Sequence, residues 1–310
     1  MISPQRIRAL DLVAPPSPGR PAHLSAASGL VRAGKYLYVV ADDELHLGVF
    51  DATGASPGSL LRLFDGELPE SASKRKKKKP DLEALTLLPR FAAFAHGALF
   101  APGSGSRPNR RMGALLGIGP DGAVSGGAVA VDLSAMFSAL DEEFPKLNIE
   151  GAVVAGGELR LFQRGNKSAR NALARFRLSD ALDSLASGAR PEPLRPIAIH
   201  RVDLGEIDAI PLCFTDGAAL PDGGMAFTAV AEDTDDGFFD GPCAGAAVGI
   251  LGPEGGLRFL ERLDRPHKIE GVEARIEGNT VRLLLVTDAD DASVPAALYS
   301  AEIPMCGDAQ

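Results

Sequence analysis

Four carboxylates and one hydroxyl recur along this chain, each at the same place in a short repeated phrase. In every copy an acidic or hydroxyl residue comes first, Gly or Ala follows, and an apolar residue then opens a strand-like run. The copies begin at Ser28, Glu83, Glu150, Asp216 and Glu270. Repetition at a nearly fixed interval indicates a repeat architecture, so we expect these side chains to occupy equivalent positions. If they converge on one point, their oxygen atoms form a site for a hard cation.

The donor types in this set favour Ca²⁺. Like charges that lie close together raise one another's pKa and are costly unless protons or a cation neutralise them. Ca²⁺ takes roughly six to eight oxygen ligands, whereas Zn²⁺ prefers His and Cys, which this set lacks. We therefore expect Ser28, Glu83, Glu150, Asp216 and Glu270 to bind Ca²⁺. The alternative is that they cap the strands or bind ordered water.

The step between copies is long enough for four short strands. Runs such as 29–32 and 36–40 are short, apolar and bounded by turn residues, as strands joined by turns are. The fifth repeat lacks its fourth run, and residues 7–13 have the missing pattern. We therefore predict an all-β, five-bladed β-propeller with four-stranded blades, a single domain over 1–310 whose N-terminal strand closes the last blade. A six-bladed ring with one degenerate blade is the alternative.

The loops after the second strands should share one rim with the repeated phrase. Binding residues concentrate on such loops, which a rigid scaffold holds in place. Arg107, Arg111, Arg164 and Asn166 can together hold a small anionic ligand, because Arg recognises phosphate and carboxylate groups in a bidentate manner. A solvated rim with salt bridges is the alternative. Two of the loops are basic, 103–111 and 163–171, and three are acidic, 42–44, 232–240 and 288–291.

The phrase at the head of each inner strand resembles that of the phytase-type esterase-like propellers and of a poorly characterised bacterial family of similar proteins. The ring of Ser28 with Glu83, Glu150 and Glu270 also resembles the ring that holds Ca²⁺ in the five-bladed calcium-activated nucleotidases, the apyrases. Asp216 departs from that pattern, because the apyrases tend to have a hydroxyl there. The resemblance implies a five-bladed propeller with axial Ca²⁺, and it carries over no catalytic residue.

Two classes of function follow from these residues. The first is a calcium-binding, metal-assisted hydrolase of a phosphate ester, a phosphoanhydride or a lactone, with the metal polarising an oxygen or activating water. The second is a non-catalytic binding module or scaffold with a structural axial cation. His267 and Lys268 adjoin Glu270 and are the candidates for general acid–base work.

Composition limits the partners. A net charge of −9 and a pI near 5.1 disfavour nucleic acid, and no apolar run is long enough to span a membrane. Cys213, Cys243 and Cys306 are too scattered for a disulfide framework or a zinc site, so we expect reduced thiols and a cytoplasmic protein. Nothing in the sequence indicates an oligomeric state.

Three segments fit the strand scheme poorly. The basic run Lys74–Lys79 predicts a mobile, solvated loop between the first two blades. Residues 133–144 have helical apolar spacing with Ser134 as a candidate N-cap, and residues 179–187 form a second short helix candidate.

Overall fold

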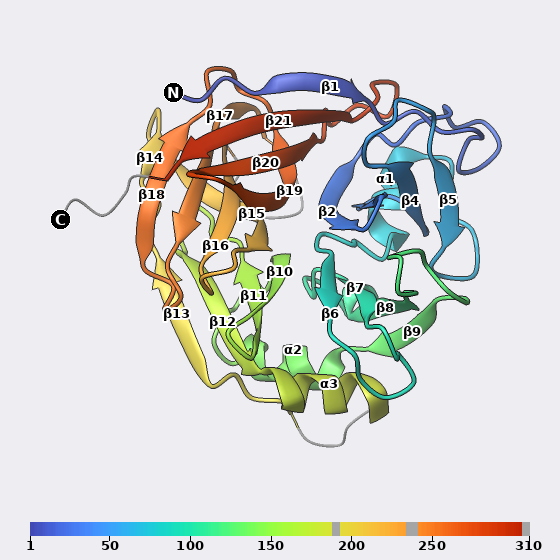
Figure 1. Cartoon of the computed structure of the whole chain (residues 1–310), viewed down its shortest axis with the longest axis horizontal. Helices are drawn as coiled ribbons and strands as arrows, with labels where there is room; N and C mark the ends of the chain where they lie inside the picture. Colours follow the sequence, from blue (N-terminus) through green and yellow to red (C-terminus); the bar gives the residue numbers. More distant parts are fainter. Residues whose placement is uncertain (188–192, 234–240, 306–310) are drawn as a thin grey trace.

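Five antiparallel sheets surround a central axis in the computed structural model, which describes residues 1–187, 193–233 and 241–305 (Figure 1). The arrangement is a five-bladed β-propeller, as the repeated phrase predicts. Each blade runs from an inner strand at the axis to an outer strand at the rim. Cys306 and residues 234–240 of one acidic loop lie outside the described residues.

The blades follow one another along the chain and each uses four consecutive strands, with two exceptions. A two-residue strand extends blade 4 at its inner edge, and the outer strand of blade 5 comes from the N-terminus. Blade 1 contains β2 (Ala27–Ala33), β3 (Tyr36–Ala41), β4 (His46–Asp51) and β5 (Ser59–Arg62), and blade 2 contains β6 (Thr86–Leu88), β7 (Ala98–Pro102), β8 (Met112–Gly117) and β9 (Val129–Asp132). Blade 3 contains β10 (Ile149–Ala155), β11 (Glu158–Gln163), β12 (Asn171–Arg177) and β13 (Ala198–Val202). Blade 4 contains β14 (Glu206–Ile207), β15 (Ile210–Ala219), β16 (Met225–Glu232), β17 (Cys243–Leu251) and β18 (Leu257–Arg262), and blade 5 contains β19 (Ile269–Glu277), β20 (Thr280–Thr287), β21 (Ala297–Pro304) and β1 (Gln5–Ala9).

Strand β1 closes the ring by completing blade 5. It pairs antiparallel with β21, from Gln5 opposite Ser300 to Ala9 opposite Ala297. The Arg8 guanidinium crosses to blade 1 and donates to the backbone carbonyls of Asp51 and Gly54, at 3.0 and 2.6 Å. Backbone pairing therefore completes blade 5, and the Arg8 side chain links that blade to blade 1.

Apolar side chains fill the spaces between neighbouring blades. Between blades 3 and 4, for example, the rings of Phe162, Phe214 and Phe227 pack edge to face at centroid distances of 5.0 and 5.1 Å. All three side chains are fully buried. This packing keeps the inner strands rigid, so the residues they present at the axis are held in fixed positions.

In the described part of the chain, α1 (Ala72–Lys78) and α2 (Ser134–Asp141) lie in connections between blades, whereas α3 (Leu178–Ser187) lies within blade 3, between β12 and β13. A short 3-10 helix, Pro108–Arg110, precedes β8. The basic run forms α1 between blades 1 and 2, so the prediction of a mobile loop there is wrong. The two predicted helices are confirmed as α2 and α3. Ser134 is the first helical residue and not the N-cap, which is Leu133. The Asp132 carboxylate instead accepts the Ser134 amide at 2.8 Å.

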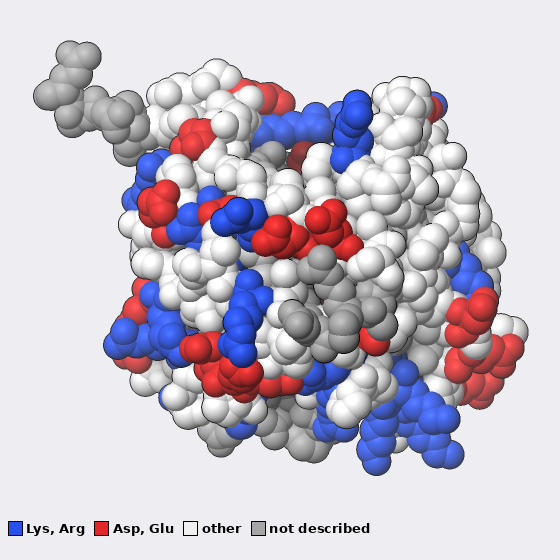
Figure 2. All heavy atoms as spheres, turned by 90° about the horizontal axis from the view of Figure 1, so that it is seen from below, with Lys and Arg blue, Asp and Glu red and all other residues white. Residues whose placement is uncertain are grey.

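Charged side chains of both signs are interspersed over the side of the molecule (Figure 2). None of the helices in the described part of the chain has the length and hydropathy that a membrane crossing requires.

Candidate functional site

A cavity of about 420 Å³ lies at the end of the axis where the inner strands begin. It is strongly polar, and charged residues from all five blades or their connections line it. Of the nine residues predicted from the sequence, the structure brings eight to this cavity and leaves Asp216 beneath it. The eight are Ser28, Glu83, Glu150, Glu270, Arg107, Arg111, Arg164 and Asn166.

β-Bulges at the start of the inner strands position the ring residues. The pairing register shifts by one residue at Ser28, at Glu150 and at Glu270, so each is the unpaired residue of a bulge. In blade 2, the bridge between Leu82 and Gly103 places Glu83 at the same step. A bulge redirects a side chain that regular pleating would send elsewhere, and here it presents these residues to the cavity.

Blade 4 departs from this pattern by one residue. Its register shift falls on Thr215, between Phe214 and Asp216, so Thr215 occupies the ring position and Asp216 occupies the position of Gly29 in blade 1. The Thr215 hydroxyl donates to the Ile269 carbonyl of blade 5 at 2.7 Å. The three-residue phrase aligns Asp216 with the glutamates, whereas the strand pairing aligns it with the glycines.

Asp216 lies beneath the cavity and is not one of the residues that line it. It is fully buried, and its Oδ2 accepts the backbone amide of Val272 from blade 5 at 2.9 Å. The backbone amides of Gly217 and Leu30 also face the Asp216 carboxyl group and favour its charged form. Burial outweighs these donors and raises the pKa of Asp216 well above its usual range. A Cβ on Gly151 would lie 3.1 Å from the Asp216 Cα, so a small residue is needed beside this carboxyl group.

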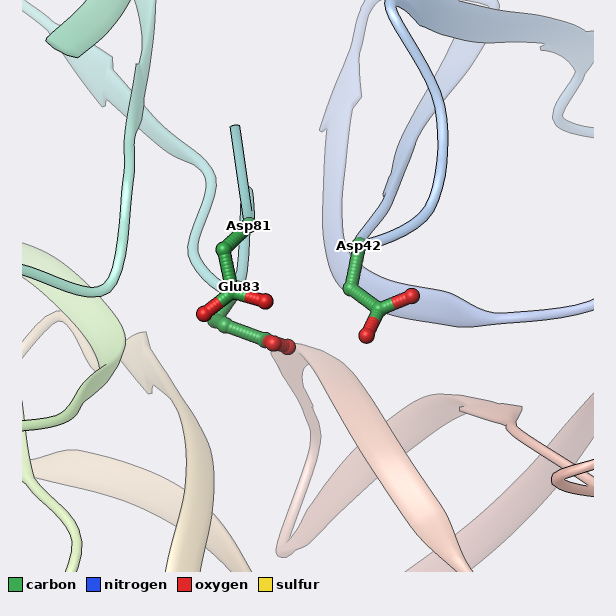
Figure 3. Close-up of side chains that lie close together, drawn as sticks. All are labelled: Asp42, Asp81 and Glu83. Carbon is green, nitrogen blue, oxygen red and sulfur yellow. The ribbon is translucent and has the colours of Figure 1, made fainter. Parts of the chain in front are cut away.

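Three carboxylates from blade 1 and the approach to blade 2 meet on one side of the cavity. One oxygen each from Asp42, Asp81 and Glu83 lies within 4.8 Å of the others, and we call this set the carboxylate cluster (Figure 3). Burial, followed by the charges of Asp81 and Glu150, raises the pKa of Glu83 to about 8. Asp81 has a φ of +60°, a strained conformation for a non-glycine residue.

Basic side chains already enter the carboxylate cluster. The Lys79 ammonium, from a side chain only 8% exposed, forms ion pairs with Asp42 and with Asp81, the latter at 2.9 Å. The Arg110 guanidinium donates to the other Asp81 oxygen at 2.5 Å. The cluster therefore contains three carboxylates and two protein cations.

A second network occupies the side formed by blades 3, 4 and 5. Arg164, at the end of β11, contacts Glu150 at 3.2 Å, Glu232 at 2.7 Å and Glu270 at 3.9 Å. Lys268 contacts Glu232 at 3.3 Å and Glu270 at 3.8 Å. Burial raises the pKa of Glu150 and of Glu270, while the neighbouring cations lower it. We call these five residues the Arg164 network.

The two groups together hold more carboxyl groups than cations. Their excess of negative charge must be met by protons, as the raised pKa values indicate, or by a bound cation. All the donors are carboxylate oxygens, which Ca²⁺ prefers, so the donor set fits the predicted ion. The six carboxyl groups are Asp42, Asp81, Glu83, Glu150, Glu232 and Glu270, and the four cations are Lys79, Arg110, Arg164 and Lys268.

The rim residues have mixed surroundings. Arg111 is paired with Asp141 of α2 through two contacts of 2.8 Å, and Arg164 is held by glutamates, so neither side chain faces the cavity without an anionic partner. Asn166 accepts the amide of Ser168 in a local turn. Two of the four residues predicted to bind an anion, Arg111 and Arg164, therefore form salt bridges, as the alternative of a solvated rim with salt bridges predicts.

The two candidates for general acid–base work, His267 and Lys268, have different surroundings in the structure. Lys268 lines the cavity, whereas the His267 ring packs against Tyr299 at a centroid distance of 4.9 Å. Burial lowers the pKa of His267.

Several residues of the site carry no motif that predicts a ligand role. Asp42 and Glu232 belong to the acidic rim loops, which was the available signal for them. Lys79 could not be distinguished from the other lysines of the basic run. Asp81 lies two residues before Glu83, in a segment without any repeat signal.

The model of a protein family described as being of unknown function, DUF6929, matches residues 23–303. The comparison with curated proteins finds no match. Among solved structures, a luciferin-regenerating enzyme is 10% identical, with 97% of this chain and 95% of that chain covered at a TM-score of 0.49. A hypothetical protein from Leishmania major is 11% identical, with 98% and 92% covered at a TM-score of 0.47. A mannose phosphorylase from Leishmania mexicana, in complex with a phosphate ion, is 12% identical, with 97% and 88% covered at a TM-score of 0.47.

Proposed function

The chain belongs to the DUF6929 family, and we propose that its axial cavity binds a divalent cation, Ca²⁺ by preference, together with a small anionic ligand. The observation that carries this proposal is the carboxylate cluster, in which oxygens of Asp42, Asp81 and Glu83 lie within 4.8 Å of one another. Ser28, Glu150 and Glu270 line the same cavity and complete a set of oxygen donors. Asp216, beneath the cavity, supports the inner strands in this proposal.

The proposed activity is hydrolysis of a phosphate ester, a phosphoanhydride or a lactone. A bound cation would supply Lewis-acid chemistry, by polarising a substrate oxygen or activating water. The resemblance of the repeated phrase to those of the phytase-type propellers and apyrases supports this class. Basic residues at the rim, among them Arg107 and Lys146, would orient the anionic end of the substrate. Arg164 would keep the glutamates around it in place.

A second candidate is a non-catalytic binding propeller. The observation that favours it is the supply of positive charge by the protein itself, because Lys79 pairs with Asp42 and Asp81 and Arg164 pairs with Glu150. In this case the four protein cations and bound protons neutralise the cavity, and its ligand is held by charge complementarity alone.

Thermal unfolding of the chelator-stripped protein across a Ca²⁺ titration separates the two candidates. A ligand at 100 times its Kd stabilises a protein by about 2.7 kcal/mol, which corresponds to a rise in Tm of about 4 °C for 310 residues. We expect this rise with Ca²⁺, a smaller one with Mg²⁺, and a weakened one in Glu83→Gln. The exposed Glu67→Gln variant is the matched control and should respond like the wild type.

An absence of any Ca²⁺ effect on Tm, together with no heat of binding in a direct titration, would refute the cation site. If the site is present, a panel of phosphate esters and lactones then tests catalysis. Turnover that depends on Ca²⁺ and is lost in Glu83→Gln supports the hydrolase. Binding of Ca²⁺ without turnover of any member supports the non-catalytic propeller.

A further inference from the structure

Helix α1 divides the basic run into two faces. Arg75 lies in the helix and Lys79 is its C-cap; the two are four residues apart and so project to the same side, where they are 7% and 6% exposed. Lys74, Lys77 and Lys78 are exposed on the other side. Buried Lys and Arg side chains are rare unless they are paired, and both inward-facing residues have carboxylate partners. The inward face of α1 is therefore built to deliver positive charge to the protein interior.

The positive charge of Lys79 enters the carboxylate cluster itself. Its ammonium is paired with Asp42 and with Asp81, two of the three residues of the carboxylate cluster. An ammonium is a compact point charge, so it can take the place of a metal ion among carboxylates. The same two carboxylates cannot hold Lys79 and a divalent cation in close contact at once, because the two positive charges repel.

The segment that carries Lys79 is held in place by a few polar contacts. Asn109 donates to the carbonyls of Lys77 and Lys79 at 3.4 and 3.2 Å, and Arg110 donates to the carbonyl of Lys76 at 2.9 Å. In the middle of the helix, Arg75 pairs with Asp43 at 3.2 Å and donates to the carbonyls of Pro69 and Glu70 at 3.1 and 2.6 Å. The inward face thus carries two buried cations and no apolar side chain, so the docking of α1 depends on these charges.

We propose that Lys79 is a built-in competitor for the divalent cation, and that binding of the cation displaces Lys79 and loosens the end of α1. This inference rests on the proposed cation site, which it supplies with a means of regulation. Helix α1 then couples occupancy of the axial site to the exposure of a lysine-rich segment at the cavity mouth. The cation affinity of the wild type is the net result of ligand binding and ammonium displacement.

Calorimetric titration of Ca²⁺ into chelator-stripped variants measures this competition. Lys79→Met removes the ammonium, and we expect it to bind Ca²⁺ roughly tenfold more tightly than the wild type, or more, because a charge-assisted bond no longer has to be broken. Lys79→Arg keeps the charge and should bind no more tightly than the wild type. Lys78→Met removes the same charge from the exposed face and is the matched control, with unchanged affinity.

The outcomes separate this inference from the proposed function. Equal affinities of the wild type and Lys79→Met would overturn the competitor role and leave the cation site in place. Binding in Lys79→Met but not in the wild type supports the competitor role in its strongest form. An absence of binding in both would refute the cation site itself, and the competitor role with it.

Limited digestion with trypsin provides a second measurement that needs only the wild-type protein. Trypsin cleaves after Lys and Arg, so the run from Lys74 to Lys79 is a natural reporter of helix docking. We expect saturating Ca²⁺ to speed cleavage within this run several-fold, as mass spectrometry of the fragments would show. Unchanged or slower cleavage in the presence of bound Ca²⁺ would refute the displacement of α1.

Discussion

Replacement of Arg164 by Met should destabilise the protein by leaving buried carboxylates without their counter-charge. The Arg164 side chain is 10% exposed and lies 3.2 Å from Glu150 and 2.7 Å from Glu232. Removal of one partner from a buried ion pair typically costs about 3–5 kcal/mol. With an unfolding entropy of about 2.1 cal/mol/K per residue over 310 residues, the expected fall in Tm is about 5–8 °C.

The deficit should depend on pH in a direction that the burial of the glutamates determines. Burial raises the pKa of Glu150 and Glu270, and loss of Arg164 raises both pKa values further. An acid whose pKa is raised by folding stabilises the protein while it is protonated, and this contribution is lost as the pH rises through the raised pKa. The difference in Tm between variant and wild type should therefore be large at pH 8 and shrink at pH 5.

Differential scanning calorimetry at both pH values, with a chelator and one fixed scan rate, measures this difference. Arg195→Met is the matched control, because Arg195 forms an exposed pair with Glu142 and its side chain is 65% exposed. Exposed pairs contribute little to stability, so we expect the Tm of the control to change by about 1.5 °C or less. A deficit in Arg164→Met that matches the control, or one that is equal at pH 5 and pH 8, would refute this account of the network.

Three further predictions concern Asp216 beneath the cavity, Asp288 at the cavity, and Gly29 of an inner strand. Asp216→Ala removes the acceptor of the buried Val272 amide of blade 5, and we expect a loss of about 1–3 kcal/mol by calorimetry. A change in Tm below about 1 °C would contradict the view that Asp216 supports the inner strands. Burial raises the pKa of Asp288 to about 6, so its protonation stabilises the fold below about pH 4 and this contribution is lost as the pH rises through 6. Asp288→Asn, which stays neutral, should therefore raise Tm at pH 8 and leave it unchanged near pH 4, and the opposite order would show that the carboxylate is stabilising. Gly29→Ala places a Cβ 2.9 Å from the backbone of the neighbouring blade and should cost about 1–3 kcal/mol in urea unfolding, whereas Gly256→Ala, with no neighbour within 4 Å, should cost less than about 1 kcal/mol.

The ring of blades was predictable because the inner strands of different blades approach their neighbours in a similar way. An inner strand tends to carry a small residue where it approaches the next blade, as the contacts around Gly29 and Gly271 show, and this leaves a visible phrase in the sequence. Blade 4 is the exception, because Asp216 occupies that position. The closing strand was predictable for the same reason, since the pattern of residues 7–13 matches other outer strands, although β1 begins at Gln5.

The position of Asp216 beneath the cavity could not be predicted from the repeated phrase. A bulge is a shift in strand pairing, and a phrase of three residues does not determine the pairing. The phrase therefore aligned Asp216 with Glu150, although Thr215 is the residue with the equivalent register. Only the pairing partners in β16 reveal that Asp216 extends toward the axis from a glycine position.

The counter-charges were missed for a different reason. A basic run reads as solvated because most charged side chains are exposed, and composition alone does not indicate which lysine has a buried partner. The partners of Lys79, Asp42 and Asp81, come from two different connections between strands. Such contacts depend on how neighbouring blades are placed, and they appear only once the ring is closed.

The closure of blade 5 by β1 has a consequence for synthesis on the ribosome. Gln5 and Ala9 are made long before their partners, Ser300 and Ala297. At translation rates of about 5–20 residues per second, β1 must wait roughly 15–60 seconds before β21 emerges. During that interval the nascent chain is an open arc with two exposed strand edges, which other proteins can pair with. A slow codon or a pause at any point between β1 and β21 would lengthen this vulnerable period.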